Sequence, residues 1–386
     1  MVSLGDIART FGLVGLTSWG GPAIVAQIRD AVVTRRHWLT DEEFNESVAL
    51  CQIVPGPMAP LTSTHVGWRL RGAVGGMVAL IAYIAPSVLL MLLLSVAYAR
   101  FGGLPSVERI LAGMRAAAVG ILMSSVWMMG PTALRDSRGL LCAALAFPAF
   151  LLGLDPLVVL PLTAALGTIL ARPIRVRRPV ALPPSADRQW RSDLFVVGVV
   201  TLALGMAVFL ASLFRPILRD ILGVMTHANL LAFGGGYTAV AVMHDSVVNE
   251  RAWLEPQKFV DALTLAQLTP GPVTCLGTFV GYVHAGVPGA LVATAGAFLP
   301  SALVLVGAAP VLVRLEQNTY VQGALRGLLG AFIAMLLAMM AMMARTALTG
   351  PLAMGIAAVS CVILLFRVSP VWVIIGTGIL AAFVRL

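Results

Sequence analysis

Two stretches of this chain place a glutamine three residues before a Pro-Gly-Pro tripeptide. They are Leu50–Pro57 and Leu265–Pro272, and each reads Leu-x-Gln-x-x-Pro-Gly-Pro. A helix cannot continue through Pro-Gly-Pro, because proline lacks the N–H that the helix needs and clashes with the preceding turn. The helix that restarts after the break presents unpaired N–H groups and a partial positive charge, which suit an oxyanion. The predicted anion-binding residues are Gln52, Pro55, Gly56, Pro57, Gln267, Pro270, Gly271 and Pro272.

Each of these features also has a structural interpretation, which the sequence leaves open. The broken helix could serve tight helix packing, and the glutamine amides could stabilise the break instead of binding a ligand. A pair of glycines upstream of each break either permits close helix contact or lets backbone amides approach the ion. These glycines are Gly20, Gly21, Gly235 and Gly236.

Charged residues inside apolar sequence are the second group of candidates, because charge within a membrane is costly and marks functional sites. Arg115 and Arg326 lie at roughly equivalent places in two apolar segments, where they could attract an anionic substrate or extend to the interface. Asp30 and Asp245 each precede an arginine by six residues, and each could bond that arginine or carry a coupled proton. The two arginines are Arg36 and Arg251.

The composition indicates that membrane helices carry these residues. Of the 386 residues 59% are hydrophobic and 11% charged, and the mean hydropathy is +0.94. Soluble domains carry about 25% charged residues. Apolar runs of membrane-spanning length recur without alternating strands, so helices are favoured over a barrel. The sequence predicts an all-α polytopic membrane protein with about 13 apolar segments and with helices broken at Pro-Gly-Pro.

The net charge of +9 comes from 25 arginines and a single lysine, Lys258. In a soluble protein such a basic chain would suggest a nucleic-acid partner. In a membrane protein, loop arginines that set the topology explain it better, with an anionic substrate as a second contributor. The four cysteines lack metal-ligand spacing, and no nucleotide-binding or nucleophile motif occurs. We therefore expect no metal, no cofactor and no enzymatic activity.

The chain contains an internal repeat. Ser18–Pro57 aligns without a gap with Phe233–Pro272, and 16 of the 40 positions are identical. Chance similarity between apolar segments does not keep tryptophan, aspartate, arginine and glutamine in register, so we infer a duplication. The predicted units are an N-terminal membrane repeat (1–171), a basic cytoplasmic linker (172–193), an unpaired transmembrane helix (194–214) and a C-terminal membrane repeat (215–386).

The number of segments predicts that the second repeat is inverted relative to the first. Seven crossings between equivalent points reverse the orientation, and transporters with inverted repeats bind substrate near the bilayer midplane. This count fails if a Pro-Gly-Pro segment is re-entrant. The positive-inside rule favours a cytoplasmic linker and N-terminus and an external C-terminus in a multi-pass protein of the cell membrane. Arg35 and Arg36 would then face outward.

These residues resemble the chromate ion transporter family over nearly the whole chain, as a long member with two repeats. The most specific element is the Leu-x-Gln-x-x-Pro-Gly-Pro motif in two ordered copies. Two apolar departures occur, namely Trp19 where the family usually has phenylalanine and Ile84–Ser87 where Phe-Leu-Pro-Ser is common. The other matching stretches are Trp19–Gly21, Phe233–Gly236, Trp38–Phe44, Trp253–Phe259 and Phe298–Ser301.

The resemblance implies a carrier that exports chromate from the cytoplasm at the expense of the proton gradient and gives chromate resistance. The alternatives are a carrier of another oxyanion such as sulfate or molybdate, a passive anion channel, and a membrane subunit that does not transport. The expected partners are chromate or a related oxyanion and the lipid bilayer. A homodimer is left open, and no nucleic acid is expected.

Overall fold

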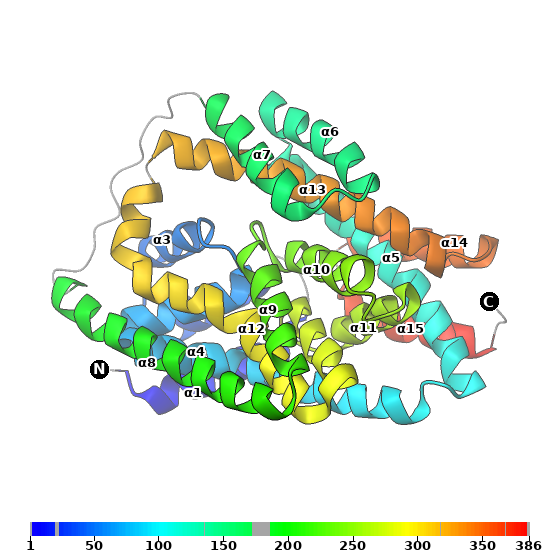
Figure 1. The fold of residues 1–386 in the computed structure, drawn as a ribbon, viewed down its shortest axis with the longest axis horizontal. Helices are drawn as coiled ribbons and strands as arrows, with labels where there is room; N and C mark the ends of the chain where they lie inside the picture. The colour runs from blue at the N-terminus through cyan, green and yellow to red at the C-terminus, as the bar shows by residue number, and fades with distance from the viewer. Residues whose placement is uncertain are drawn as a thin grey trace.

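The computed structural model describes residues 2–19, 23–134, 136–171, 186–316, 318–366 and 368–383. Over these residues the chain forms helices (Figure 1). An isolated β-bridge joins Trp19 to Gly271. Five helical stretches of the described chain are long and apolar enough to cross a membrane, which confirms the all-α membrane class. The count of about 13 apolar segments stays a prediction. The five stretches are Met58–Phe101, Pro105–Pro131, Ser192–Phe214, Val273–Ala308 and Thr319–Ala347.

The helices follow the same order on either side of α8 (Ala186–Phe214), and corresponding helices have equal or similar lengths. For example, α5 and α13 both have 29 residues, and α6 and α14 both have 15. The first series is α1 (Leu4–Thr17), α2 (Ala23–Arg29), the π-helix η1 (Asp30–Arg35), α3 (Asp41–Cys51), α4 (Met58–Phe101), α5 (Pro105–Ala133), α6 (Ser137–Leu151) and α7 (Pro156–Ile169). The second is α9 (Ile217–Leu230), α10 (Gly236–His244), the π-helix η2 (Asp245–Glu250), α11 (Pro256–Leu268), the 3₁₀ turn η3 (Val273–Cys275), α12 (Leu276–Glu316), α13 (Thr319–Ala347), α14 (Pro351–Leu365) and α15 (Pro370–Phe383).

The long helices α4 and α12 each fold back on themselves at a glycine. Gly72 and Gly286 have φ angles of 63° and 62°, which a residue with a side chain rarely adopts. In α4 the two arms touch so closely that a Cβ on Gly67 would overlap the carbonyl of Gly75. Gly281 and Gly289 make the same contact in α12. The short arm that follows each Pro-Gly-Pro, which we call the exit arm, therefore packs against the rest of its own helix.

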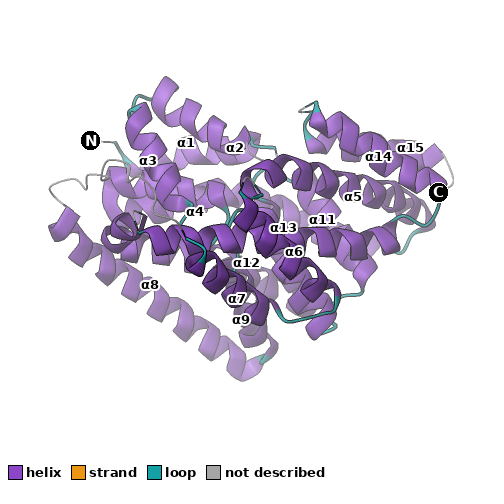
Figure 2. Ribbon diagram, turned by 90° about the horizontal axis from the view of Figure 1, so that it is seen from above, coloured by secondary structure: helices purple, strands orange, loops and turns teal. Residues whose placement is uncertain are grey.

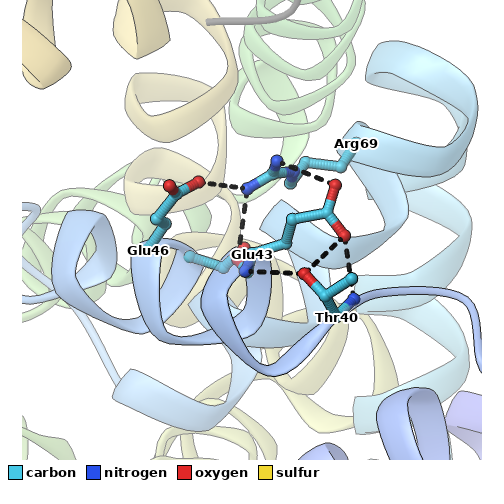
Figure 3. A network of polar contacts seen from close by, with 5 residues as sticks. Thr40, Glu43, Glu46 and Arg69 are labelled. Atoms are coloured by element: carbon cyan, nitrogen blue, oxygen red, sulfur yellow. Dashed lines mark hydrogen bonds and ion pairs between the residues drawn. The ribbon is translucent and has the colours of Figure 1, made fainter. Parts of the chain in front are cut away.

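In the first half, α3 and the exit arm form a hairpin with the first Pro-Gly-Pro at its tip. Thr40 and Glu43 form a capping box that starts α3. At the open end of the hairpin, Arg69 Nη1 lies 3.1 Å from the Glu46 carboxylate and donates to the Glu43 carbonyl at 3.1 Å, as Figure 3 shows. At about 1.5 Å per residue, the 11 residues of α3 span about 16 Å, roughly half of a hydrocarbon core.

The chain before this hairpin also returns to the face on which it begins. Arg71 Nη1 donates to the carbonyl of Val2 at 3.2 Å. The pKa of Asp6 is lowered chiefly by the hydrogen bond from the Ser3 hydroxyl and also by the positive charge of Arg36. Asp6 therefore lies within range of the Arg36 charge, although the positive-inside argument would place Arg36 and the N-terminus on opposite faces. The reason is that α1 and α2, with 14 and 7 residues, are each too short to cross.

Helix α8 runs along one edge of the molecule, and its two ends contact the two glycine folds (Figures 1 and 2). About two turns after its start, the Asp193 carboxylate accepts from the Ala73 N–H at 2.8 Å and from Trp68 Nε1 at 2.7 Å. Just beyond its end, Arg215 Nη1 donates to the carbonyl of Ala285 at 3.4 Å. The 23 residues from Ser192 to Phe214 span about 35 Å, so the two folds lie at opposite ends of a helix of membrane-crossing length.

Helix α8 begins at Ala186, inside the predicted linker 172–193. Residues 172–185 lie outside the described residues. Most side chains of its apolar stretch are exposed, as Phe195, Leu202 and Phe209 illustrate, which suits a helix that faces lipid.

The two series of helices interlock instead of packing as separate halves. Helix α5 packs against α14 and α15, whereas α13 packs against α6 and α7 (Figure 2). Glycines allow this close approach: a Cβ on Gly113 would lie 2.6 Å from the Thr377 carbonyl, and one on Gly327 would overlap the Thr163 carbonyl. Helix α4 packs against α12, so the long helices that carry the exit arms meet in the interior.

Candidate functional site

Both Pro-Gly-Pro breaks are buried inside the protein. The first lies between α3 and α4, the second between α11 and η3. Their central glycines, Gly56 and Gly271, have φ angles of 131° and 97°, so only glycine fits these positions without strain. Burial away from lipid is what a substrate site at the break requires.

Each break is bonded to the opposite half of the chain. The N–H of Gly56 donates to the carbonyl of Ala232 at 2.8 Å, and the N–H of Gly271 donates to the carbonyl of Ser18 at 2.6 Å. Ser18 and Ala232 directly precede the glycine turns of their halves. The two glycine N–H groups are therefore engaged structurally, and N–H donors for an anion must come from the first turn of each exit arm.

Each break also packs against a serine of the opposite long helix. A Cβ on Gly56 would lie 2.6 Å from Ser301 Oγ, and one on Gly271 would lie 3.2 Å from Ser87 Oγ. The Ser87 hydroxyl donates to Thr269 Oγ1 at 3.4 Å. We call Gly56, Gly271, Ser87 and Ser301 the central junction. The repeat alignment pairs these serines, but it could not show that each one contacts the break of the other half.

The exit arms place further hydroxyl groups beside the junction. In the first arm the buried hydroxyls of Thr62 and Thr64 donate to carbonyls one turn earlier, both at 2.8 Å. In the second, Thr274 Oγ1 is buried and has no hydrogen-bond partner. An unpaired buried hydroxyl is costly, so this group is available to a bound oxyanion.

The two glutamines of the motif have different environments. Gln267 is 6% exposed, and its Nε2 donates to the Tyr237 hydroxyl at 2.9 Å, which ties the end of α11 to α10. Gln52 is exposed and caps the end of α3. The residue equivalent to Tyr237 is Pro22, which lies outside the described residues and has no hydroxyl to offer.

Only the second glycine turn can be placed. Gly20 and Gly21 lie outside the described residues. Gly235 has a φ of 135° and precedes α10, which starts at Gly236. A Cβ on Gly236 would lie 3.2 Å from Val273 Cγ1, so this turn lies against the start of the second exit arm.

The predicted bonds from Asp30 to Arg36 and from Asp245 to Arg251 are not formed. Asp30 pairs with Arg35 at 2.7 Å, and Asp245 accepts from Asn249 at 2.8 Å. Each aspartate starts a π-helix, in which residues five apart are neighbours, so Asp30 meets Arg35. The arginines lie over tryptophan rings instead: Arg36 over Trp38 and Arg251 over Trp253, with centroid distances of 5.8 and 5.2 Å.

The two intramembrane arginines of the sequence analysis are both paired with carboxylates. Arg115 is almost fully buried and forms ion pairs with Glu108 and with Asp261. Arg326 is partly exposed and pairs with Asp136 at 3.0 Å. Because both guanidinium groups already have carboxylate partners, we leave both outside the proposed substrate contacts.

Asp261 and Asn229 are buried polar residues that the sequence analysis did not single out. Asp261 lies in α11 and is 2% exposed. Asn229 lies fully buried in α9. Their polar types within otherwise apolar segments were the signal that could have identified them. Among the described residues, no group of three or more His, Cys, Asp or Glu side chains could hold a metal ion.

Comparison with known proteins places these motifs in context. The model of the chromate transporter family matches two regions of the chain, residues 5–169 and 219–382. A chromate transport protein of Cupriavidus metallidurans is 32% identical over 309 residues, which cover 80% of this chain and 74% of the relative. An uncharacterized transporter of Methanocaldococcus jannaschii is 28% identical over 341 residues, covering 86% of this chain and 82% of the relative.

A third relative is a probable chromate transport protein of Synechococcus elongatus, 29% identical over 346 residues, which cover 85% of this chain and 82% of the relative. No solved structure gives a significant match.

Proposed function

The chain belongs to the chromate transporter family, and from that premise we propose that it is a secondary active carrier that exports chromate from the cytoplasm in exchange for protons, thereby giving chromate resistance. The observation that supports it most is the central junction, where each Pro-Gly-Pro break is buried against a serine of the opposite half. Two helix starts with their partial positive charges then face the protein interior, where a dianion can be held without a permanently buried cation.

The substrate contacts are the first-turn N–H groups of the two exit arms and the unpaired hydroxyl of Thr274. Gly56 and Gly271 shape the breaks, but their own N–H groups donate to the carbonyls of Ala232 and Ser18. Gln267 holds the second break in place through Tyr237. These donors recognise a tetrahedral oxyanion and not a particular central atom, so sulfate is the second candidate substrate.

The two halves form an inverted repeat in this proposal. The glycine folds of α4 and α12 lie at opposite ends of α8, which favours opposite membrane faces for equivalent parts of the two halves. Each Pro-Gly-Pro hairpin then enters from its own face and ends near the middle of the bilayer. In this topology three of the described helices cross between equivalent points, namely α4 beyond its fold, α5 and α8, which are long and apolar enough to do so. Three crossings are an odd number, as were the seven counted from the sequence. The second half is therefore still inverted relative to the first in this proposal, although the Pro-Gly-Pro hairpins do not cross the membrane.

The orientation follows from the arginines. The chain leading into α8 is rich in arginine, and the N-terminus lies at Arg71, on the same face as Asp193. The positive-inside rule then makes this face cytoplasmic and the C-terminus external, in the cytoplasmic membrane.

Transport into inverted membrane vesicles tests this function. With labelled chromate outside and an acidic lumen, we expect accumulation above the external concentration, and a protonophore should abolish it. Equilibration without accumulation would identify a passive channel instead. A parallel assay with labelled sulfate tests the specificity: if sulfate is accumulated in preference to chromate, the substrate assignment is wrong.

A further inference from the structure

A cluster of charged and polar side chains joins α11 to α5 and α4. The carboxylate of Asp261, on α11, accepts from the Tyr98 hydroxyl at 2.8 Å and lies 3.4 Å from Arg115 Nε. Arg115 also pairs with Glu108, which accepts from Gln257 Nε2 at 3.0 Å. The side chains of Asp261 and Arg115 are 2% and 6% exposed, whereas that of Glu108 is 46% exposed. The cluster therefore leads from the surface to a fully buried carboxylate.

The charges in this cluster do not balance unless a proton is bound. Two carboxylates share one guanidinium, so the ionised cluster carries an excess negative charge, and of the two carboxylates it is Asp261 that lies buried, where charge is expensive. One proton removes the excess, and the buried carboxylate of Asp261 gains most from binding it. The charged and titratable groups that act on Asp261 are Arg115 and Glu108 from α5 and Tyr98 from α4.

Asp261 has a place for that proton. Its Oδ1 is buried without a hydrogen bond, although Arg115 Nε lies within ion-pair distance. The Nε–H of Arg115 donates instead to the carbonyl of Leu111 at 3.3 Å. We propose that Asp261 binds and releases the proton that is exchanged for the substrate, and that Glu108 connects it to solvent. This assignment rests on the proton-coupled carrier proposed above.

Helix α11 links this carboxylate to the second break. Gln267 follows Asp261 by six residues, or about 9 Å along the helix, and Pro270 comes three residues later. The helix is held by the Asp261 cluster at one position and by the Gln267–Tyr237 bond near its end. Protonation of Asp261 removes its attraction to Arg115, which loosens α11 and shifts the position of the break.

The location of the cluster suits proton entry from outside. Residues 73–101 of α4 cross the membrane in the proposed topology, so the start of α5 with Glu108 lies on the face opposite the N-terminus. Helix α11 enters from that same external face, since Gln257 in its first turn bonds Glu108. A proton from the external side therefore reaches Asp261 without passing the substrate.

The equivalent position in the first half has a different environment. Glu46 aligns with Asp261, but its side chain is 33% exposed and it pairs with Arg69 within its own hairpin (Figure 3). The position equivalent to Tyr98 is the buried Leu312. Only the second hairpin therefore carries this buried cluster, and Glu46 provides a matched control.

The test compares Asp261→Asn with Glu46→Gln in the full-length protein in inverted vesicles. For Asp261→Asn we expect at least a tenfold loss of accumulation driven by the pH gradient, while exchange of labelled for unlabelled chromate continues and loses its pH dependence. Glu46→Gln should keep both properties. Accumulation by Asp261→Asn at the wild-type level would overturn the proposal. If the wild type itself never accumulates chromate, the carrier function fails instead.

A readout without transport covers the case in which Asp261→Asn is inactive altogether. Infrared difference spectra of the purified protein between acid and alkaline pH contain protonated-carboxyl bands from several residues, and one of these bands should come from Asp261. That band should be absent from Asp261→Asn and present in Glu46→Gln. A band that persists in Asp261→Asn would contradict the assignment of the proton to this residue.

Discussion

Gly56 shows how narrowly single residues define the breaks. Its φ of 131° is strained for any residue with a side chain, and a Cβ would lie 2.6 Å from Ser301 Oγ in the opposite half. A larger residue here must distort either the break or α12. The positive φ and the close contact act together, so the position has no conservative substitution.

We predict that Gly56→Ala destabilises the protein by about 2–6 kcal/mol, because backbone strain and overpacking each cost about 1–3 kcal/mol. Gly103, which is exposed and has no atom within 4 Å of an added Cβ, is the control position, and Gly103→Ala should be close to neutral. Thermal unfolding of the purified variants in detergent measures the difference. Equal unfolding temperatures for both variants would contradict the described geometry.

The residue types in the sequence predicted where the helices break. They did not predict which other residues each side chain contacts in the fold. Pro-Gly-Pro ended its helices as predicted, because the chemistry of proline acts locally. The exposure of Gln52 against the burial of Gln267 was not predictable, since it depends on Tyr237 from another helix. The ion pairs of Arg115 were hidden for the same reason: its partner Asp261 lies 146 positions along the chain and meets it only in the folded protein.

At the scale of elements, Asn229 of α9 hydrogen-bonds two backbone groups of α12 that lie beside Pro300 and are not paired with each other. Pro300 opens the helix there, and the Ser301 N–H donates to Asn229 Oδ1 at 2.9 Å instead of to the carbonyl one turn earlier. That carbonyl, of Ala297, accepts from Asn229 Nδ2 at 2.7 Å. One side-chain amide thus replaces a missing helical hydrogen bond beside the central junction.

We predict that Asn229→Ala costs about 1–3 kcal/mol, because it leaves two buried backbone groups unpaired. In a Pro300→Ala background the helix can close, and the cost of Asn229→Ala should fall by about 1 kcal/mol or more. The free energies of unfolding of the wild type, the two single variants and the double variant together form a double-mutant cycle that measures this coupling. Strictly additive effects would show that Asn229 does not compensate for the proline.

The element boundaries that the sequence predicted best were those with local signals. The Pro-Gly-Pro breaks ended α3 and α11, and Pro156 starts α7 as a first-turn proline should. The sequence separates the two arms at Arg69–Gly72, where arginines interrupt the apolar run, but it does not show that the arms fold back on each other at Gly72 and Gly286. This fold-back explains why a count of apolar segments overstates the number of crossings in the proposed topology.

At the scale of the whole molecule, equivalent helices exchange partners across the two halves. Helices α5 and α13 each pack against the last two helices of the opposite half. The sequence alignment predicts a repeat, but it could not predict this exchange, because a single sequence does not reveal which helices pack together. The interlocking means that neither half has a complete set of neighbours without the other.

The opposed entry of the two breaks is tested most directly by cysteine labelling at one pair of equivalent positions. Arg35 and Glu250 are both exposed and follow the same π-helical turn in the two halves. Arg35→Cys and Glu250→Cys would be made with Cys361, the partly exposed native cysteine, replaced by serine. In intact cells, a membrane-impermeant thiol reagent should label Glu250→Cys, and it should label Arg35→Cys only after permeabilisation. Labelling of both from the same side would contradict the inverted arrangement and with it a substrate site shared by the two breaks.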